Sequence, residues 1–319
     1  MQPDEGIKAK IPAAFQARLR YEEPMSAHTS WHAGGPAEAY FAARDADDLA
    51  AFLRSLPAEV PVYWVGLGSN LLVRAGGIRG VVIATVGVLT RIERRCERRI
   101  YSEVSVPCAR IARACARWQL ADGEFFSGIP GLLGGALAMN AGAFGDETWK
   151  HVVSVETIDR RGQRRRREAA DFEFGYRAVA LREGTSLGVS EWFVSAELEF
   201  EPRAAQPGKN LELLERRRET QPLGVWSCGS VFKNPPGDHA ARLIEAAGLK
   251  GQRVGGAVVS EKHANFIINT GQASAGDLEQ LICHVQAVVQ RQYGILLEPE
   301  VRIVGDPAPQ SPSSPEASC

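Results

Sequence analysis

The chain has 319 residues, of which 45% are hydrophobic and 24% are charged, as in an ordinary soluble globular protein. Its 37 basic and 38 acidic residues leave a net charge of −1, which excludes a general electrostatic attraction to nucleic acid or membranes. The polar start lacks the apolar core of a secretory signal, and no apolar run approaches the roughly 20 residues of a membrane span. We therefore expect a cytoplasmic protein of about two or three domains.

The cysteines are scattered along the chain and include no C-x-x-C pair. This spacing argues against a zinc site and against a disulfide scaffold, so we expect a reduced protein without a bound metal. The cysteines are Cys96, Cys108, Cys115, Cys228, Cys283 and Cys319.

Residues 1–20 are polar, and a short amphipathic helix is expected over residues 15–19. After a Gly-Gly-Pro turn and an extended apolar run, residues 45–56 are acidic at their start and apolar on one face, which predicts a helix. Residues 61–66, PVYWVG, are expected to form a buried strand.

The stretch GLGSNLLV begins like a dinucleotide-binding fingerprint, because Gly66 and Gly68 follow a predicted strand. Leu71 stands where that fingerprint requires a third glycine, and no helix is predicted after it. The pattern indicates strand, glycine loop and strand, and it disfavours a Rossmann domain. The loop suits phosphate through its backbone N–H groups and the Ser69 hydroxyl, although taken alone it fits a tight β-turn without a ligand somewhat better.

Residues 128–145, GIPGLLGGALAMNAGAFG, are poor in side chains, which is typical of backbone that approaches another group closely. We expect Gly131, Gly134 and Gly135 to leave main-chain N–H groups uncovered, and a helix beginning near Leu133 to add its positive end. Diphosphate is the ligand that such a surface suits best. Tight packing of a helix against a sheet explains the same composition, and the two interpretations carry equal weight.

Residues 152–168 predict a hairpin with a tight turn near Gly162, and the run from Arg164 to Arg167 is interpreted as its solvated edge. A nucleic-acid patch is the less favoured interpretation, since the run lies beside acidic residues and lacks interleaved aromatics. Further strands are expected within residues 90–106, 172–184, 192–202, 258–271 and 295–305, and helices over residues 108–120, 210–222, 238–251 and 274–294.

Three helix ends carry recognisable signals. Asp238 is expected to cap the start of its helix and Gly248 to end it, while Ser274 is expected to cap the long helix that follows. After Gly305 the chain is rich in proline and serine and is expected to be disordered.

Six motifs occur in an order and spacing that resembles the UDP-N-acetylenolpyruvoylglucosamine reductases, the MurB flavoenzymes. Each motif alone is weak, but six in order over residues 21–305 are highly specific. The resemblance implies an α+β fold with a two-part FAD-binding domain of the vanillyl-alcohol oxidase type, followed by a smaller α+β substrate-binding domain. The motifs are GLGSNLLV, SGIPGLLGGALAMNAGAFG, FGYR, CGSVFKNP, SEKHANFIIN and LEPEVRIVG.

The resemblance also implies a division of the chain. Residues 1–20 are an N-terminal extension, 21–86 and 87–205 the two FAD-binding subdomains, 206–305 the substrate-binding domain and 306–319 a disordered tail. The short C-terminal region with SEKHANFIIN resembles the family variant that lacks an extra substrate-covering loop.

Members of this family use NADPH and FAD to reduce the enolpyruvyl ether of UDP-N-acetylglucosamine to the lactyl ether of UDP-N-acetylmuramate, a precursor of bacterial peptidoglycan. By resemblance, two segments of the chain hold FAD, in agreement with their interpretation as phosphate-binding backbone. The residues are Gly66, Gly68, Ser69, Asn70 and Leu71 in the first segment, and Gly128, Ile129, Pro130, Gly131, Gly134, Gly135, Asn140, Ala141 and Gly142 in the second.

Hydride addition to the enolpyruvyl group leaves negative charge beside the carboxylate, so the site needs donors there and a proton donor at the carbon. By resemblance, Arg177 supplies a permanently charged fork, Glu300 a hydrogen bond and Ser230 the proton. A free serine is a poor acid, so Ser230 needs a neighbour such as Lys233 or water to stabilise its alkoxide. Each residue taken singly also fits a structural role.

Tyr176, Lys233, Asn234 and Asn265 are expected to contact the substrate, whereas His263 is expected to be structural. Two positions depart from the family pattern. Val179 stands where a serine is usual, and His32 stands where many members have arginine.

Three functions compete. The first is an active reductase whose partner is a small UDP-sugar enolpyruvyl ether, acting as a monomer without nucleic acid. The second is a non-catalytic flavin-binding paralogue, which the retention of Ser230, Arg177 and Glu300 opposes and Val179 keeps open. The third is another oxidoreductase on the same flavin fold, which CGSVFKNP and LEPEVR oppose because both lie in the substrate domain.

Overall fold

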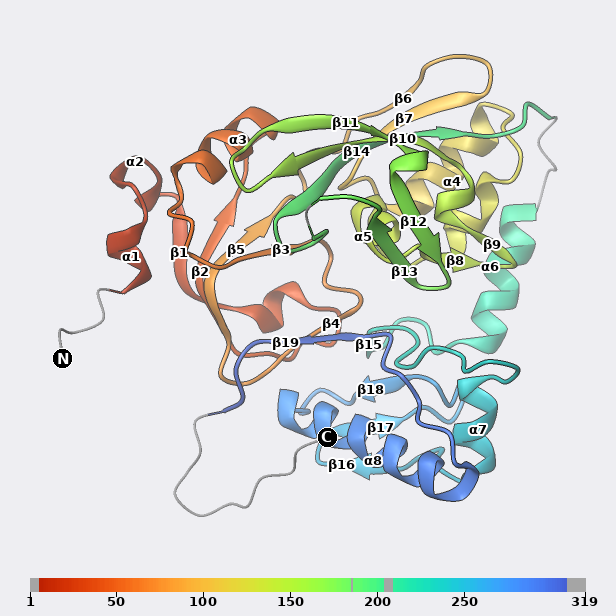
Figure 1. Cartoon of the computed structure of the whole chain (residues 1–319). Coiled ribbons are helices and arrows are strands. Elements are labelled where there is room, and N and C mark those ends of the chain that lie inside the picture. Colours follow the sequence, from red (N-terminus) through yellow and green to blue (C-terminus); the bar gives the residue numbers. More distant parts are fainter. Residues whose placement is uncertain (1–5, 185, 204–208, 309–319) are drawn as a thin grey trace. The chain divides into compact units, whose positions relative to one another are not determined.

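The computed structural model describes residues 6–184, 186–203 and 209–308 (Figure 1). Its chain divides into two compact units that interleave along the sequence. The first unit contains Met1–Arg20, Ala39–Leu67 and Gly80–Glu219, and the second contains Tyr21–Glu38, Gly68–Arg79 and Thr220–Cys319. Two short segments from early in the chain therefore belong to the same unit as its C-terminal third.

A four-stranded sheet and a five-stranded sheet account for most strands before residue 200. The first has the order β1-β2-β5-β3, and the second is antiparallel with the order β11-β10-β14-β7-β6. The strand predicted at residues 61–66 is β3, but it is not fully buried, because Tyr63 is 38% exposed. The bounds are β1 (Leu19–Pro24), β2 (Pro36–Ala42), β3 (Val62–Val65), β5 (Ile78–Ala84), β6 (Ile92–Arg94), β7 (Arg99–Glu103), β10 (Val152–Asp159), β11 (Arg164–Glu168) and β14 (Glu191–Glu199).

The helix predicted over residues 45–56 is α3 (Ala46–Ser55), which begins where the Asp45 side chain accepts a hydrogen bond from Asp48 N. The short helix expected over residues 15–19 is present as α2, but it lies earlier, at Ala13–Gln16, because Leu19 already begins β1. Other helices are α1 (Ile7–Lys10), α4 (Cys108–Arg117), α5 (Leu133–Ala138), α6 (Lys209–Thr220), and the 3-10 helices η1 (Met25–His28), η2 (Gly123–Gly128), η3 (Thr148–Lys150) and η4 (Ala169–Asp171).

The predicted hairpin over residues 152–168 is confirmed. Strands β10 and β11 pair antiparallel, and Gly162 in the turn has a φ of +69°. All four arginines of β11 from Arg164 to Arg167 form ion pairs with carboxylates, such as Arg164 Nε with Glu156 Oε1 at 2.8 Å. Because each guanidinium of the run already has an acidic partner, the hairpin-edge interpretation is confirmed over the nucleic-acid patch.

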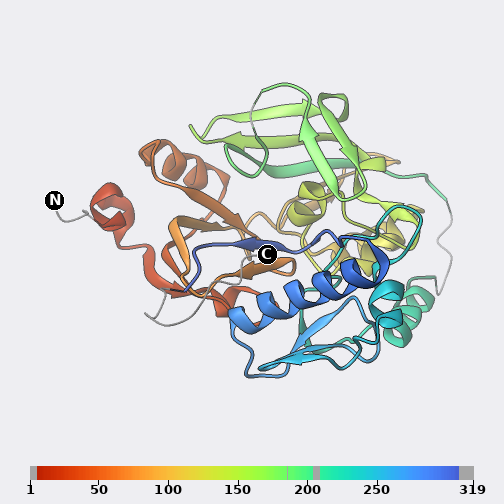
Figure 2. The same ribbon diagram turned by 60° about the horizontal axis from the view of Figure 1, so that its bottom comes forward.

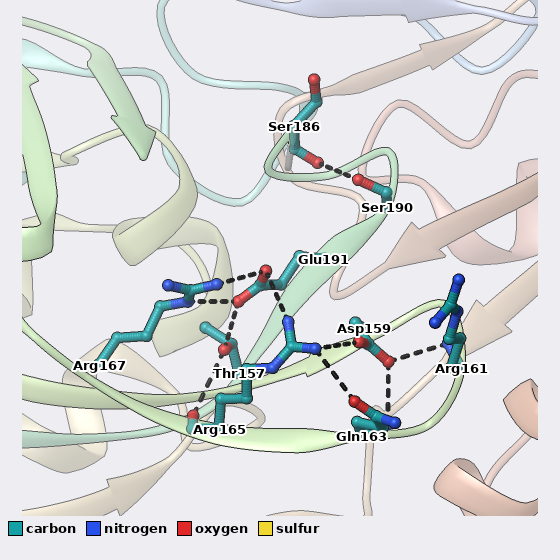
Figure 3. A network of polar contacts seen from close by, with 9 residues as sticks. All are labelled: Thr157, Asp159, Arg161, Gln163, Arg165, Arg167, Ser186, Ser190 and Glu191. Atoms are coloured by element: carbon teal, nitrogen blue, oxygen red, sulfur yellow. Dashed lines mark hydrogen bonds and ion pairs between the residues drawn. The ribbon is translucent and has the colours of Figure 1, made fainter. Parts of the chain in front are cut away.

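A buried carboxylate connects three strands of this sheet (Figure 3). Glu191, at the start of β14, is 0% exposed and accepts hydrogen bonds from Arg167 Nε and Nη2 at 2.6 and 2.9 Å. Thr157 Oγ1 on β10 donates to the same carboxylate at 2.5 Å. These bonds raise the pKa of the Arg167 guanidinium against the opposing effect of burial.

The second unit contains a four-stranded sheet with the order β15-β18-β17-β16. Figure 2 shows the long helix α8 lying along this sheet, and its apolar side chains form a core with those of α7, for example Leu281 with Leu243. Strand β4 pairs in parallel with β19, so that Leu72 lies opposite Ile303. The bounds are β4 (Leu71–Val73), β15 (Trp226–Ser227), α7 (Ala240–Ala246), β16 (Arg253–Val254), β17 (Ala257–Val259), β18 (Ile267–Asn269), α8 (Ala275–Tyr293) and β19 (Arg302–Val304).

The helix-end signals of the second unit are confirmed with one exception. Ser274 caps α8 through a capping box with Asp277, and Gly248 follows α7 with a φ of +73°. Asp238 does not cap α7, because the N-cap residue is His239. The Asp238 carboxylate instead accepts hydrogen bonds from His239 N and from the Arg242 guanidinium.

The expected tail begins later than predicted, since Asp306 still forms a β-bridge with Gly77. The disorder predicted for residues 309–319 cannot be compared, since these residues lie outside the described part of the chain. Free thiols are present at Cys96, Cys108, Cys115 and Cys228.

Within the described ranges, no helix is both long and apolar enough to cross a membrane. Over the same part of the chain, no three His, Cys, Asp or Glu side chains are grouped so as to hold a metal ion.

Candidate active site

Arg177 lies in the tight turn of a hairpin in the first unit, between β12 (Phe172–Gly175) and β13 (Ala178–Leu181). Its φ of +54° is unusual for a residue with a long side chain, and such strain is concentrated at functional sites. Its guanidinium donates to Asn140 O at 3.3 Å and to Gly142 O at 3.2 Å, and it lies over the Tyr176 ring. Two sequence motifs more than thirty residues apart thus meet at this turn.

The side chain of Asn140 is fully buried and serves the fold of this region. Its Nδ2 donates to Gly175 O at 3.0 Å, and its Oδ1 accepts from Trp149 N at 3.0 Å. Both amide atoms therefore form hydrogen bonds within the chain. The same amide fixes the hairpin that presents Arg177.

The expectation that Gly131 and Gly134 leave their N–H groups uncovered is wrong. Gly131 N donates to Ile129 O at 3.0 Å, and Gly134 N donates to Val104 O at 2.8 Å. A Cβ at Gly134 would lie 3.1 Å from Val104 Cβ, so this glycine is required by packing between α5 and its neighbour. The packing interpretation, which the sequence left level with ligand binding, therefore accounts for part of the stretch.

Gly135 differs from Gly134 because it faces open space. Apart from its own helix and chain neighbours, a Cβ at Gly135 would have no atom of the described residues within 4 Å, and one at Gly66 would touch Leu132 Cδ1 at 3.4 Å. Helix α5 begins beside them at Leu133, as predicted, with no side-chain cap and no acidic residue in its first turn. The first N–H groups of α5, at Leu133 and Gly134, donate to Val106 O and Val104 O, so it is the bare backbone at Gly135 that fits the close approach of a dinucleotide cofactor such as FAD.

In the second unit, the loop from Gly68 to Leu71 is fixed by the chain on both sides. Gly68 has a φ of +65°, and a Cβ there would collide with the His28 carbonyl oxygen, so no other residue fits. Asn70 Nδ2 donates to Glu300 O at 3.0 Å, and Asn70 O accepts from Arg302 N at 3.1 Å. The glycine loop is therefore joined directly to the LEPEVR motif.

The CGSVFKNP and LEPEVR motifs lie side by side. Glu300 N donates to Val231 O at 2.7 Å, and Phe232 forms an antiparallel bridge with Pro299. Ser230 and Glu300, which are seventy residues apart in the sequence, are thereby held on neighbouring extended segments. Both residues are partly exposed.

Cys228 is the other protic side chain at the start of this segment, and it is buried. Burial raises the pKa of its thiol well above the ordinary value, and the negative charge of Glu300 adds to the effect. The thiol therefore stays protonated and unreactive at neutral pH.

Lys233 and Asn234 are both engaged with neighbouring residues. Lys233 Nζ lies 2.5 Å from Glu298 Oε1, and Lys233 N donates to Glu298 O at 2.9 Å. Asn234 Oδ1 accepts from Ala240 N at 3.1 Å and so supplies the side-chain acceptor at the start of α7. Glu298 was missed from the sequence, although it stands two positions before Glu300 in the same motif.

Asn265 is 4% exposed, and its amide contacts Phe232 rather than the surface. His263 is partly buried, with its ring edge-on to Phe266 at 4.8 Å and its Nδ1 accepting from Asn265 N. Burial lowers the pKa of His263, so the ring is neutral near pH 7 and has a structural role, as expected.

His32 and Val179, the two departures from the family pattern, both lie beside aromatic residues of the chain. His32 has a φ of +51°, and its ring packs against Trp226 with centroids 4.5 Å apart. Val179 lies in β13 opposite Phe174.

Comparison with known proteins assigns both parts of the chain. Residues 37–167 match an FAD-binding domain model, and residues 221–304 match the C-terminal domain of UDP-N-acetylenolpyruvoylglucosamine reductase. The expected order, an FAD-binding domain followed by a smaller C-terminal domain, is thereby confirmed.

Individual relatives agree with the domain models. The chain is similar to the UDP-N-acetylenolpyruvoylglucosamine reductase of Alkalilimnicola ehrlichii, with 57% identity over 90% of this chain and 95% of the relative. The reductase of that name from Methylococcus capsulatus is 54% identical over 93% of this chain and 97% of the relative. A crystal structure of the Thermus caldophilus reductase superposes with a TM-score of 0.73 at 31% identity, covering 89% of this chain and 99% of that one.

Proposed function

The chain belongs to the UDP-N-acetylenolpyruvoylglucosamine reductase family, and we propose that its Ser230, Glu300 and Arg177 carry out the family's reaction. It is a flavoenzyme of peptidoglycan precursor synthesis, a UDP-N-acetylmuramate dehydrogenase that uses FAD and NADPH. The observation that carries the residue assignment is the pairing of Glu300 N with Val231 O, which holds Ser230 and Glu300 on adjacent segments.

Bound FAD would supply the hydride, taken from NADPH, for reduction of the enolpyruvyl carbon. We propose that it is held by the bare backbone at Gly66 and Gly135, by residues of the stretch from Gly128 to Gly142 other than the bonded N–H groups of Gly131 and Gly134, and by the loop from Gly68 to Leu71. The open space at Gly135 and Gly66 supports this assignment, because FAD diphosphate needs close approach to backbone.

Gly135→Ala is expected to lower FAD affinity by about tenfold or more, equal to about 1.4 kcal/mol. The new methyl group would occupy the bare surface, while alanine in place of glycine in α5 stabilises the FAD-free protein by about 0.5–1 kcal/mol. Fluorescence titration with FAD and thermal melts of the FAD-free protein measure the two effects.

Gly134→Ala is the matched control, because its Cβ would press on Val104 Cβ. It is expected to lower the melting temperature, whereas Gly135→Ala raises it. Wild-type FAD affinity in Gly135→Ala would remove this glycine from the cofactor site.

The residues of the chain then act on the substrate. Arg177 binds the substrate carboxylate, where negative charge develops, through a guanidinium whose turn is fixed by the main chain of residues 140–142. Ser230 Oγ donates a proton to the carbon that receives the developing charge. Glu300, in its protonated form or through a bridging water, donates a hydrogen bond to the same charge, and its main-chain N–H fixes the segment that carries Ser230.

We further propose substrate contacts for Tyr176, Lys233 and Asn234. Tyr176 is 52% exposed at the same turn as Arg177, which supports a surface role. The charge of Lys233 is matched by Glu298, so its contribution to a Ser230 alkoxide is moderated by that partner. Asn265, which the sequence placed with this group, has its amide engaged with Phe232.

We propose the same division into domains that the sequence motifs imply. Residues 21–86 and 87–205 form the flavin part and residues 206–305 the substrate part. The protein is proposed to act as a cytoplasmic monomer and to belong to the family variant without the extra substrate-covering loop.

The assay that tests the function separates its two half-reactions. NADPH is expected to bleach the yellow FAD-loaded protein under anaerobic conditions, and the enolpyruvyl sugar nucleotide is expected to restore the colour. Bleaching without recovery would indicate a different oxidoreductase, and no bleaching would indicate a non-catalytic flavoprotein. Stopped-flow absorbance of the flavin band follows both steps.

A further inference from the structure

We infer that Asn265 is a positioning residue for Ser230, acting through Phe232 rather than by touching the substrate. The inference rests on the proposed role of Ser230 as proton donor. Asn265 Oδ1 accepts a hydrogen bond from Phe232 N at 2.9 Å, and Asn265 Nδ2 donates to Phe232 O at 2.8 Å. The main chain adds a third bond, from Val231 N to Asn265 O at 2.9 Å.

The antiparallel bridge explains why Phe232 needs such a partner. Its neighbours make the inter-segment bonds, since Lys233 N donates to Glu298 O and Glu300 N donates to Val231 O. Phe232 and Pro299 are therefore a non-hydrogen-bonded pair, so the N–H and C=O groups of Phe232 point to the opposite side. Phe232 is 2% exposed, and these two groups would be costly to leave without partners.

An asparagine amide supplies the missing partner because it carries a donor and an acceptor, as a peptide group does. Asn265 thus replaces one residue of an adjacent strand and holds Phe232 from one side, while Pro299 lies on the other. Ser230 stands two residues before Phe232 in this segment. A shift of the segment would therefore displace the Ser230 hydroxyl relative to Glu300.

The test compares Asn265→Ala and Asn265→Asp in the FAD-loaded protein. Alanine removes both side-chain bonds, and aspartate keeps the size but places an acceptor against Phe232 O. Both variants are expected to be reduced by NADPH at the wild-type rate. Reoxidation by the enolpyruvyl sugar nucleotide is expected to be slowed about 10- to 100-fold, because small displacements of a reacting group have effects of this size.

A solvent deuterium isotope effect distinguishes positioning from general loosening. If Ser230 is displaced, proton transfer limits reoxidation more strongly, and the isotope effect on that step rises in both variants. Asn269→Ala is the matched control, because Asn269 is also 4% exposed and its amide bonds Trp31 O, Gly271 N and Ala273 N. It is expected to lower the melting temperature similarly and to leave the reoxidation rate and isotope effect unchanged.

Equal reoxidation in Asn265→Ala, Asn265→Asp and Asn269→Ala would overturn the inference. If Asn265→Ala does not fold, the aspartate variant, whose volume matches, decides the question through the same two readings. A wild-type reoxidation rate in Ser230→Ala would instead disprove the proposed proton donor, and the positioning role would fall with it.

Discussion

Ser230→Ala is expected to slow reoxidation of the reduced enzyme by the enolpyruvyl sugar nucleotide by about 10³-fold, within the usual range for loss of a general acid. Such a factor corresponds to about 4 kcal/mol of activation free energy. Reduction of the flavin by NADPH is expected to keep its wild-type rate, because no proton from Ser230 is needed in that step. Anaerobic stopped-flow absorbance measures each half-reaction separately.

Ser227→Ala provides the control for Ser230→Ala. Ser227 lies three residues earlier in β15, where it pairs with Ile268, and it has no proposed chemical role. Both half-reactions are expected to keep wild-type rates in this variant. Equal slowing of both half-reactions in Ser230→Ala would show that Ser230 supports the fold or FAD binding instead of donating the proton.

Glu191→Ala is expected to cost about 3–5 kcal/mol in the free energy of unfolding, as is usual when one partner of a buried ion pair is removed. Glu191 is 0% exposed, and its loss would leave Arg167 and Thr157 without their shared acceptor (Figure 3). The effect should appear as a lower midpoint in urea unfolding monitored by circular dichroism, with FAD in excess.

Glu168→Ala is the matched control in the same hairpin. Glu168 pairs with Arg166 at 3.1 Å with both side chains about 60% exposed, and its carboxylate also caps the short helix η4, so the expected loss is about 1 kcal/mol. Similar losses for the two variants would mean that burial of the Glu191 carboxylate adds nothing to the stability of the sheet.

The long helices and the catalytic motifs were the parts most readily predicted from sequence. Helix α8 carries its own start signal in Ser274 and Asp277 and its own stop at Gly294, and both signals act over a few residues. The order of the six motifs gave the family, which the relatives at 57% and 54% identity confirm. Helix-capping residues and the order of motifs can both be recognised from the sequence alone.

The partners of backbone groups were not predictable in the same way. The N–H of Gly134 is satisfied by Val104, thirty residues away, and the groups of Phe232 are satisfied by Asn265, thirty-three residues away. A glycine-rich segment shows that the backbone lacks side chains, but it does not show which N–H groups already donate to other parts of the chain. Asn265 was predicted to contact the substrate because it is a polar residue within a functional motif. The sequence does not show that its side-chain amide bonds the backbone of Phe232 as a neighbouring strand would.

The interleaving of the two units sets the order in which the chain is able to fold during synthesis. Trp31 Nε1 donates to Ile267 O, and the β4 segment at Leu71–Val73 pairs with Arg302–Val304. These early segments emerge from the ribosome more than two hundred residues before their partners and have to wait for them. Contacts of such large sequence separation form slowly. The nascent chain therefore exposes the apolar surface of these segments during synthesis, a state in which chains are prone to aggregate.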